Sequence, residues 1–98
     1  MAGIRLVTRA DDAGLNGAVN RAIRSAVNDG VVRNISLMAA APAIEDAASV
    51  LGDLSKSVDY GLHVTLTAEW ENPRWGPVLD GERVASAVRR DGTFHVTV

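Results

Sequence analysis

The feature that most constrains the fold is a regular alternation of strand-like and helix-like segments. An apolar, β-branched run over 4–8 predicts a strand, and its lack of strict alternation suits a strand covered on both faces. Further strands are predicted within 31–40, centred on 34–38, and over 59–67. Helical patterns separate these runs, and the connections are short. The order therefore predicts an α/β fold of parallel βαβαβ units joined by right-handed crossovers.

The first helical pattern is strongly amphipathic. Its apolar residues recur at spacings of three and four, and they are Leu15, Ala18, Val19, Ala22, Ile23, Ala26 and Val27. The opposite face is polar and consists of Asn16, Asn20, Arg21, Arg24, Ser25 and Asn28. Gly30 ends this helix. The second helix is predicted to begin near Pro42 and to end at Gly52, with a buried stripe of Ile44, Ala47, Ala48 and Leu51.

The last third of the chain is less regular. Residues 68–81 predict a structured loop that contains two tryptophans, and residues 83–89 predict a short helix. Residues 93–98 alternate, which predicts an extended segment. Phe94, Val96 and Val98 share one face of that segment, and His95 lies on the other with two threonines.

Composition limits the chain to one small domain over residues 1–98. An apolar content of 47% can build a core. The net charge is −2, and the scattered basic residues form no cluster of the kind that binds nucleic acid. Cysteine is absent, which excludes disulfides and thiolate metal sites. No signal-peptide pattern or bilayer-length apolar run is present, so we expect a cytoplasmic protein with no nucleic-acid or membrane partner.

Two adjacent carboxylates, Asp11 and Asp12, follow the first predicted strand, and His63 lies within or near the end of the third. Ligands bind at the carboxyl ends of strands in parallel α/β sheets and barrels. An acidic pair there calls for a cation, a shared proton or an arginine partner. The simpler interpretations are a helix-entry or turn pair for the acids and a hydrogen-bonded structural histidine for His63.

Four segments taken together resemble the YdjC/ChbG family of carbohydrate deacetylase-like proteins. They are residues 5–15 (Arg-Leu-Val-Thr-Arg-Ala-Asp-Asp-Ala-Gly-Leu), residues 20–23 (Asn-Arg-Ala-Ile), Ser36-Leu37-Met38 with Pro42, and residues 61–67 (Gly-Leu-His-Val-Thr-Leu-Thr). The resemblance runs across almost the whole chain. A subgroup of the family also resembles the loop over 69–78.

The resemblance implies part of a distorted (β/α) barrel and metal-dependent removal of N-acetyl groups from amino sugars such as chitooligosaccharides. Carried over by position, Asp12 and His63 would bind a divalent metal, Mg²⁺ or Zn²⁺ among others, and Asp11 would accept a proton. Trp70, Arg74 and Trp75 are the predicted contacts to a small carbohydrate substrate. For the two tryptophans, packing is the simpler interpretation.

The sequence departs from the family at Ala13, where many members have an aromatic residue, and in length. Members continue with a His-Leu-Asp-Ser-His-like segment that supplies the last metal ligand. His95 is the other histidine of this chain, and its place in the late extended segment favours a solvated or subunit-interface residue over a replacement ligand.

Three βα units cannot close a barrel, which requires roughly 250 residues. We therefore expect either a homo-oligomer that covers the exposed sheet edges or a fragment of a longer product. With two metal ligands, catalysis by this chain alone is not expected. The alternative to a deacetylase part is a non-catalytic fold remnant or assembly module of the same family.

Overall fold

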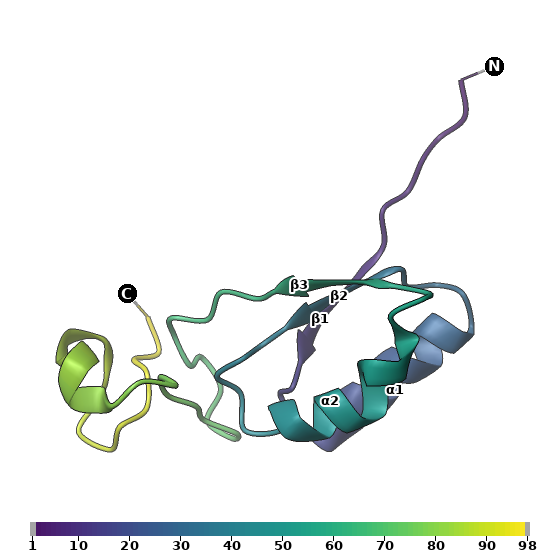
Figure 1. Ribbon diagram of the computed structural model, residues 1–98. Helices are drawn as coiled ribbons and strands as arrows, with labels where there is room; N and C mark the ends of the chain where they lie inside the picture. Colours follow the sequence, from purple (N-terminus) through teal and green to yellow (C-terminus); the bar gives the residue numbers. More distant parts are fainter. Residues whose placement is uncertain (1, 98) are drawn as a thin grey trace.

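The computed structural model describes residues 2–97 and contains a three-stranded parallel sheet with both helices packed on one face (Figure 1). The elements are β1 (Arg9–Ala13), α1 (Gly17–Asn28), β2 (Asn34–Leu37), α2 (Ile44–Leu51) and β3 (Asp59–Leu62). The strands lie side by side in the order β1-β2-β3. This confirms the predicted βαβαβ units, because two right-handed crossovers in the same direction place both helices on the same side.

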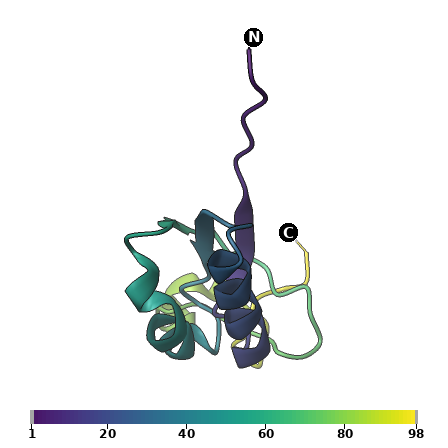
Figure 2. The ribbon, with the colours of Figure 1, turned by 90° about the vertical axis from the view of Figure 1, so that its right-hand side faces the viewer.

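The first strand begins later than the sequence pattern predicts. Arg9 pairs with Asn34, the first residue of β2, so residues 2–8 have no neighbouring strand to pair with. They leave the sheet as an extended segment (Figures 1 and 2). Their apolar side chains, Ile4, Leu6 and Val7, are exposed. The predicted strand over Ile4–Thr8 is therefore wrong. A strand needs hydrogen-bonding partners, and here they stop at Thr8, whose carbonyl accepts from the Asn34 backbone.

Helix α1 begins at its N-cap, Asn16, whose side chain accepts a hydrogen bond from the Val19 backbone at 2.9 Å. Its apolar face packs Ile23 and Val27 against the sheet. One residue of the predicted polar face, Asn20, is completely buried, which corrects the expectation from periodicity. The reason is the neighbouring helix, since α2 lies beside α1 and contributes the groups that bind the Asn20 amide.

The main core lies between the sheet and the two helices. Its buried members are Ala13, Ile23, Val27, Val32, Ile35, Ala47, Leu51, Leu54 and Val58. At its rim Arg24 of α1 donates to the Val50 carbonyl and makes two hydrogen bonds to Asp53, at 2.6 and 2.9 Å. These bonds hold the pKa of the Asp53 carboxyl below its ordinary value. The pair therefore ties α1 to the end of α2.

A second core joins the C-terminal third to the end of the sheet. It consists of Leu15, Met38, Ala41, Ala68, Trp75 and Phe94. The predicted helix over 83–89 is instead a 3₁₀ segment, Gly81–Ala87, with a kink at Val84. The predicted extended segment is confirmed at Phe94, which is buried and bridges Val88 in antiparallel fashion. Val96 is exposed, and Val98 lies outside the described residues.

Among residues 2–97, no helix has the length and apolarity that crossing a bilayer requires.

Gly14, in the turn after β1, has no space around it for a side chain. Its φ is +104°, and an added Cβ would lie 3.2 Å from both the Met38 carbonyl oxygen and the Ile44 side chain. We expect Gly14→Ala to lower the free energy of unfolding by about 1–3 kcal/mol, because both strain and crowding oppose it. Urea denaturation followed by circular dichroism measures this.

Gly52→Ala is the matched control, since Gly52 has a helical φ of −62° and open space around its Cβ position. That variant should change stability by about 1 kcal/mol or less. Equal effects of the two substitutions would contradict the strained turn.

Candidate functional site

A β-bulge in β1 shapes the acidic pair. Ala10 pairs with Ile35 and Ala13 with Leu37, so three steps along β1 match two along β2. The extra residue lies at Asp11–Asp12, and Asp12 has a φ of +64°. The carboxylates therefore lie inside the strand and not beyond it, which corrects their predicted place. Such bulges re-aim side chains, often beside active sites, and a non-glycine residue with positive φ is uncommon.

The bulge brings Asp12 to His63 across the end of the sheet. His63 follows directly after β3, and its backbone N–H donates to the Leu37 carbonyl at 2.8 Å. Met38, which follows Leu37 in the chain, donates its N–H to the Ala13 carbonyl at 2.8 Å. Two consecutive residues at the end of β2 therefore bond to both sides of the site, to Ala13 of β1 and to His63 after β3. The Oδ1 atom of Asp12 lies 3.4 Å from the Nδ1 atom of His63.

The His63 Nδ1 atom is shielded from water and has no hydrogen-bond partner. At 3.4 Å, the contact with Asp12 is too long and too poorly aligned for a charge-assisted hydrogen bond. Two ligand atoms that each lie about 2.1 Å from one divalent cation are about 3.0–3.4 Å apart. The carboxylate and the imidazole are also the donor types such a cation takes. The pair fits a shared cation.

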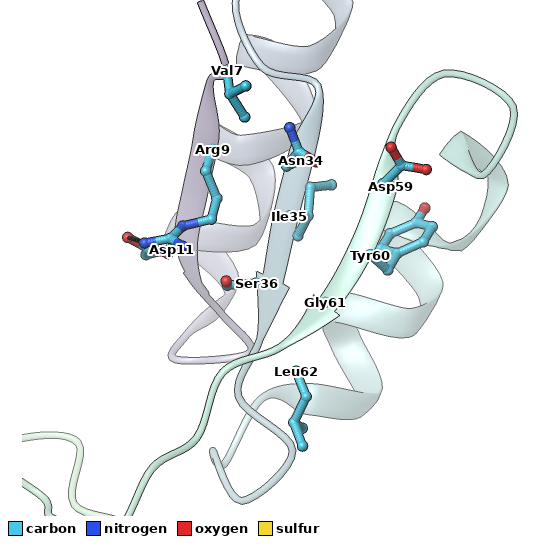
Figure 3. Close-up of a pocket in the computed structure, with 10 residues that line it drawn as sticks. All are labelled: Val7, Arg9, Asp11, Asn34, Ile35, Ser36, Asp59, Tyr60, Gly61 and Leu62. Atoms are coloured by element: carbon cyan, nitrogen blue, oxygen red, sulfur yellow. Dashed lines mark hydrogen bonds and ion pairs between the residues drawn. The ribbon is translucent and has the colours of Figure 1, made fainter.

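Asp11 has a different partner, Arg9 of the same strand. The Arg9 Nε atom lies 2.7 Å from Asp11 Oδ1, and the two side chains meet beside β1 in Figure 3. With side-chain exposures of 61% and 46%, this ion pair adds little stability. Its consequence is orientation of the Asp11 carboxylate. Sequence reasoning missed Arg9, although opposite charges two residues apart on a strand indicate such a pair.

The sheet face opposite the helices is polar and hollowed (Figure 3). Arg9, Asn34 and Asp59 occupy one register row across the three strands. Together with Asp11, Ser36 and Gly61, and with the less polar Val7, Ile35, Tyr60 and Leu62, they line a hollow of about 580 Å³. That volume falls within the range of small-molecule sites. A polar ligand could therefore lie on this face beside Asp11.

The loop residues predicted to contact substrate are placed differently from one another. Trp70 is 51% exposed, whereas Trp75 is 4% exposed and belongs to the second core. Arg74 donates to the Thr93 hydroxyl at 3.2 Å and to the Phe94 carbonyl at 2.8 Å, which ties the loop to the C-terminal segment. The packing interpretation of Trp75 is therefore confirmed. Contact with substrate stays a prediction for all three residues.

Within the described part of the chain, no cluster of three His, Asp or Glu side chains could hold a metal ion. His95 is exposed and lines a surface hollow with Arg89, Arg90 and Asp91. The structure thus brings Asp12 and His63 together as a pair and leaves His95 apart. This agrees with the sequence-based preference against His95 as a ligand.

Comparison with known proteins extends this picture. A family model described as YdjC-like protein matches residues 5–98. A carbohydrate deacetylase from Vibrio vulnificus is 34% identical over 91 residues, and one from Thermoanaerobacter pseudethanolicus is 30% identical over 89 residues. The crystal structure of a candidate cellobiose-phosphate cleavage protein from Enterococcus faecalis V583 superposes with a TM-score of 0.78 at 29% identity.

These matches cover 91–93% of this chain but only about a third of each relative, 32% and 33% for the two deacetylases and 33% for the solved structure. The family match includes Asp11, Asp12 and His63, and it spans nearly the whole sequence. The chain therefore belongs to the family of YdjC-like proteins.

Proposed function

We propose that this chain forms part of the active site of a metal-dependent carbohydrate deacetylase. Asp12 and His63 would hold the divalent cation, and Asp11 would act as the base. The observation that carries the proposal is the shielded, unpartnered His63 Nδ1 atom, 3.4 Å from the Asp12 carboxylate. The names of the related deacetylases support the reaction type.

The proposed reaction is hydrolysis of an acetamide. Water attacks the carbonyl carbon, the C–N bond breaks, and acetate and a free amino sugar are released. A bound cation would supply Lewis-acid polarisation of the carbonyl oxygen. Asp11 accepts a proton from the attacking water and returns it to the leaving nitrogen, and Arg9 holds its carboxylate in position. The proposed substrates are N-acetylated chitooligosaccharides, and the polar hollow beside Asp11 would accept their hydroxyl groups.

We further propose that β1, β2 and β3 are the first strands of a (β/α) barrel. Two features support this. The sheet face that would line the barrel interior is polar, and the outer face is covered by helices. The relatives have about two thirds of their length beyond the matched region, which is room for further βα units.

A second function has one observation in its favour. Residues 2–97 contain no third metal-ligating side chain beside Asp12 and His63, which is compatible with a non-catalytic remnant or assembly module. That reading predicts no cation binding that depends on these two residues.

Metal binding distinguishes the two readings. We expect calorimetry to show that the 98-residue chain binds Ni²⁺ or Zn²⁺ weakly. Asp12→Asn and His63→Gln should each weaken this binding about 10-fold or more, because each removes one of the two ligands. His95→Gln and Asp59→Asn are matched controls on exposed residues and should bind as the unaltered chain does. Equal affinity across all variants would exclude the metal site.

The reaction itself is tested in a chimera. Replacing the matched third of the Vibrio vulnificus deacetylase with this chain supplies the rest of a full-length enzyme. The chimera should release acetate from N-acetylated chitooligosaccharides with Zn²⁺ present. Asp11→Asn should lower kcat by about 100-fold or more, as expected for loss of a general base. A folded chimera that binds metal but releases no acetate would contradict the proposed substrate or reaction.

As the alternative to that barrel, we propose that copies of this chain associate through uncovered sheet edges. Within residues 2–97, β3 has a strand neighbour on one side only, and the exposed side chains of Leu62, Val64 and Leu66 continue from it. An uncovered edge with apolar side chains favours pairing with another chain.

Sedimentation velocity should therefore detect a homo-oligomer that dissociates when Val64→Lys and Leu66→Lys are combined, because the added charges oppose pairing. Val78→Lys, at an exposed loop position, is the matched control and should leave the oligomer intact. A monomer at all concentrations tested would rule out this association.

A further inference from the structure

A buried amide bonds to the turn that follows Asp12. Asn20 of α1 is 0% exposed. Its Oδ1 atom accepts a hydrogen bond from the Gly14 N–H at 2.8 Å. Its Nδ2 atom donates to the Asp46 carboxylate at 2.7 Å and to the Ala43 carbonyl at 3.2 Å. Both donors of the amide are used, so this one side chain joins the turn after β1 to the first turn of α2.

The same turn is held at its other backbone groups. The Gly14 carbonyl accepts from the Ala43 N–H at 2.8 Å, and the Leu15 N–H donates to the Asp12 carbonyl at 3.0 Å. Gly14 is itself buried, and its N–H would lose its acceptor if the Asn20 side chain were removed. A buried, unsatisfied N–H is costly, and the turn would have to move to reach a new partner.

Movement of this turn would reach Asp12, which lies two residues before Gly14. Asp12 adopts a positive φ, which is uncommon for a residue other than glycine, although Asp adopts it more readily than most. The direction of its side chain therefore depends on the turn that follows it, and Asn20 bonds to that turn without a hydrogen bond to Asp12 or His63. The amide is also required chemically, since a carboxylate at this position would face the Asp46 carboxylate and the Ala43 carbonyl.

We propose that Asn20 is a positioning residue for the metal site: its buried amide fixes the Gly14 turn and so keeps the Asp12 carboxylate aimed at His63. This inference rests on the proposed function in one respect, that Asp12 and His63 share a cation. The ordering of the turn by Asn20 is independent of that assignment.

The experiment uses two readouts on the 98-residue chain. Amide hydrogen exchange by NMR, without metal, reports on the turn, and calorimetry with Ni²⁺ reports on the site. For Asn20→Ala we expect the Gly14 amide to exchange at least about 10-fold faster relative to the β2 amides, and the Ni²⁺ Kd to rise about 10-fold or more, as for other residues that orient metal ligands.

The matched control is Arg24→Ala, one helical turn further along α1, which removes the bonds to Asp53. It should leave the Gly14 exchange ratio and the Ni²⁺ affinity within about 2-fold of the unaltered chain.

A charge exchange provides rescue. Asn20→Asp alone should disrupt the turn as strongly as Asn20→Ala. Combined with Asp46→Asn, the new carboxylate can accept from both the Gly14 N–H and the new amide at position 46, while its contact with the Ala43 carbonyl stays unfavourable, so slow exchange and Ni²⁺ affinity should return in part. This pair also decides the question if Asn20→Ala does not fold.

The possible failures are distinct. If the unaltered chain does not bind Ni²⁺, the proposed metal site is wrong, and the exchange data alone decide the role of Asn20. If Ni²⁺ binds but Asn20→Ala changes neither readout, the positioning role is wrong. The role is also overturned if Arg24→Ala weakens Ni²⁺ binding as much as Asn20→Ala does, or if the charge exchange restores neither readout, because the effect would then be general destabilisation.

Discussion

The hydrogen bonds at the carboxyl end of β2 are the constraint on which the rest of the site depends. Leu37 accepts from the His63 N–H, and Met38 donates to the Ala13 carbonyl. Since β2 is the central strand, these two consecutive residues set the heights of the β1 and β3 ends relative to each other. The bulge at Asp11–Asp12 then turns one carboxylate toward His63 and leaves the other paired with Arg9. Two adjacent, identical residues thereby acquire different surroundings and different proposed roles.

The two faces of the sheet also differ, in this case in their polarity. The helix-covered face is apolar and contains the main core, whereas the opposite face carries Arg9, Asn34 and Asp59 in one row. Parallel strands are ordinarily covered on both faces, whereas here the helices cover one face only. Within residues 2–97, β1 and β3 are edge strands, and one side of each has no strand neighbour. The residues after β3 are exposed.

Asn20 illustrates how a helix can do more than cover a sheet. From periodicity it belongs to the polar face of α1, and that face does carry the solvent-exposed Arg21. Two helices packed side by side, however, bury part of each other's flank. A polar residue on that flank must find partners there, and Asn20 finds them on the β1 turn and on α2. The same packing that buries the amide bonds it to Gly14, two residues after Asp12.

The sequence by itself determined the order of strands and helices, the parallel α/β class and the family, and it singled out Asp11, Asp12 and His63 as candidate site residues. Those follow from local periodicity and from short motifs, which depend on neighbours in the chain. Only the tertiary structure decided that the first strand begins at Arg9, that a bulge gives the two aspartates different neighbours, and that Trp75 and Asn20 are buried. Each of these depends on a partner distant in sequence: Asn34 of β2 for Arg9, Leu37 for the bulge, Phe94 for Trp75, and Ala43 and Asp46 for Asn20. Strand pairing and helix packing create these contacts, and no local pattern encodes their register.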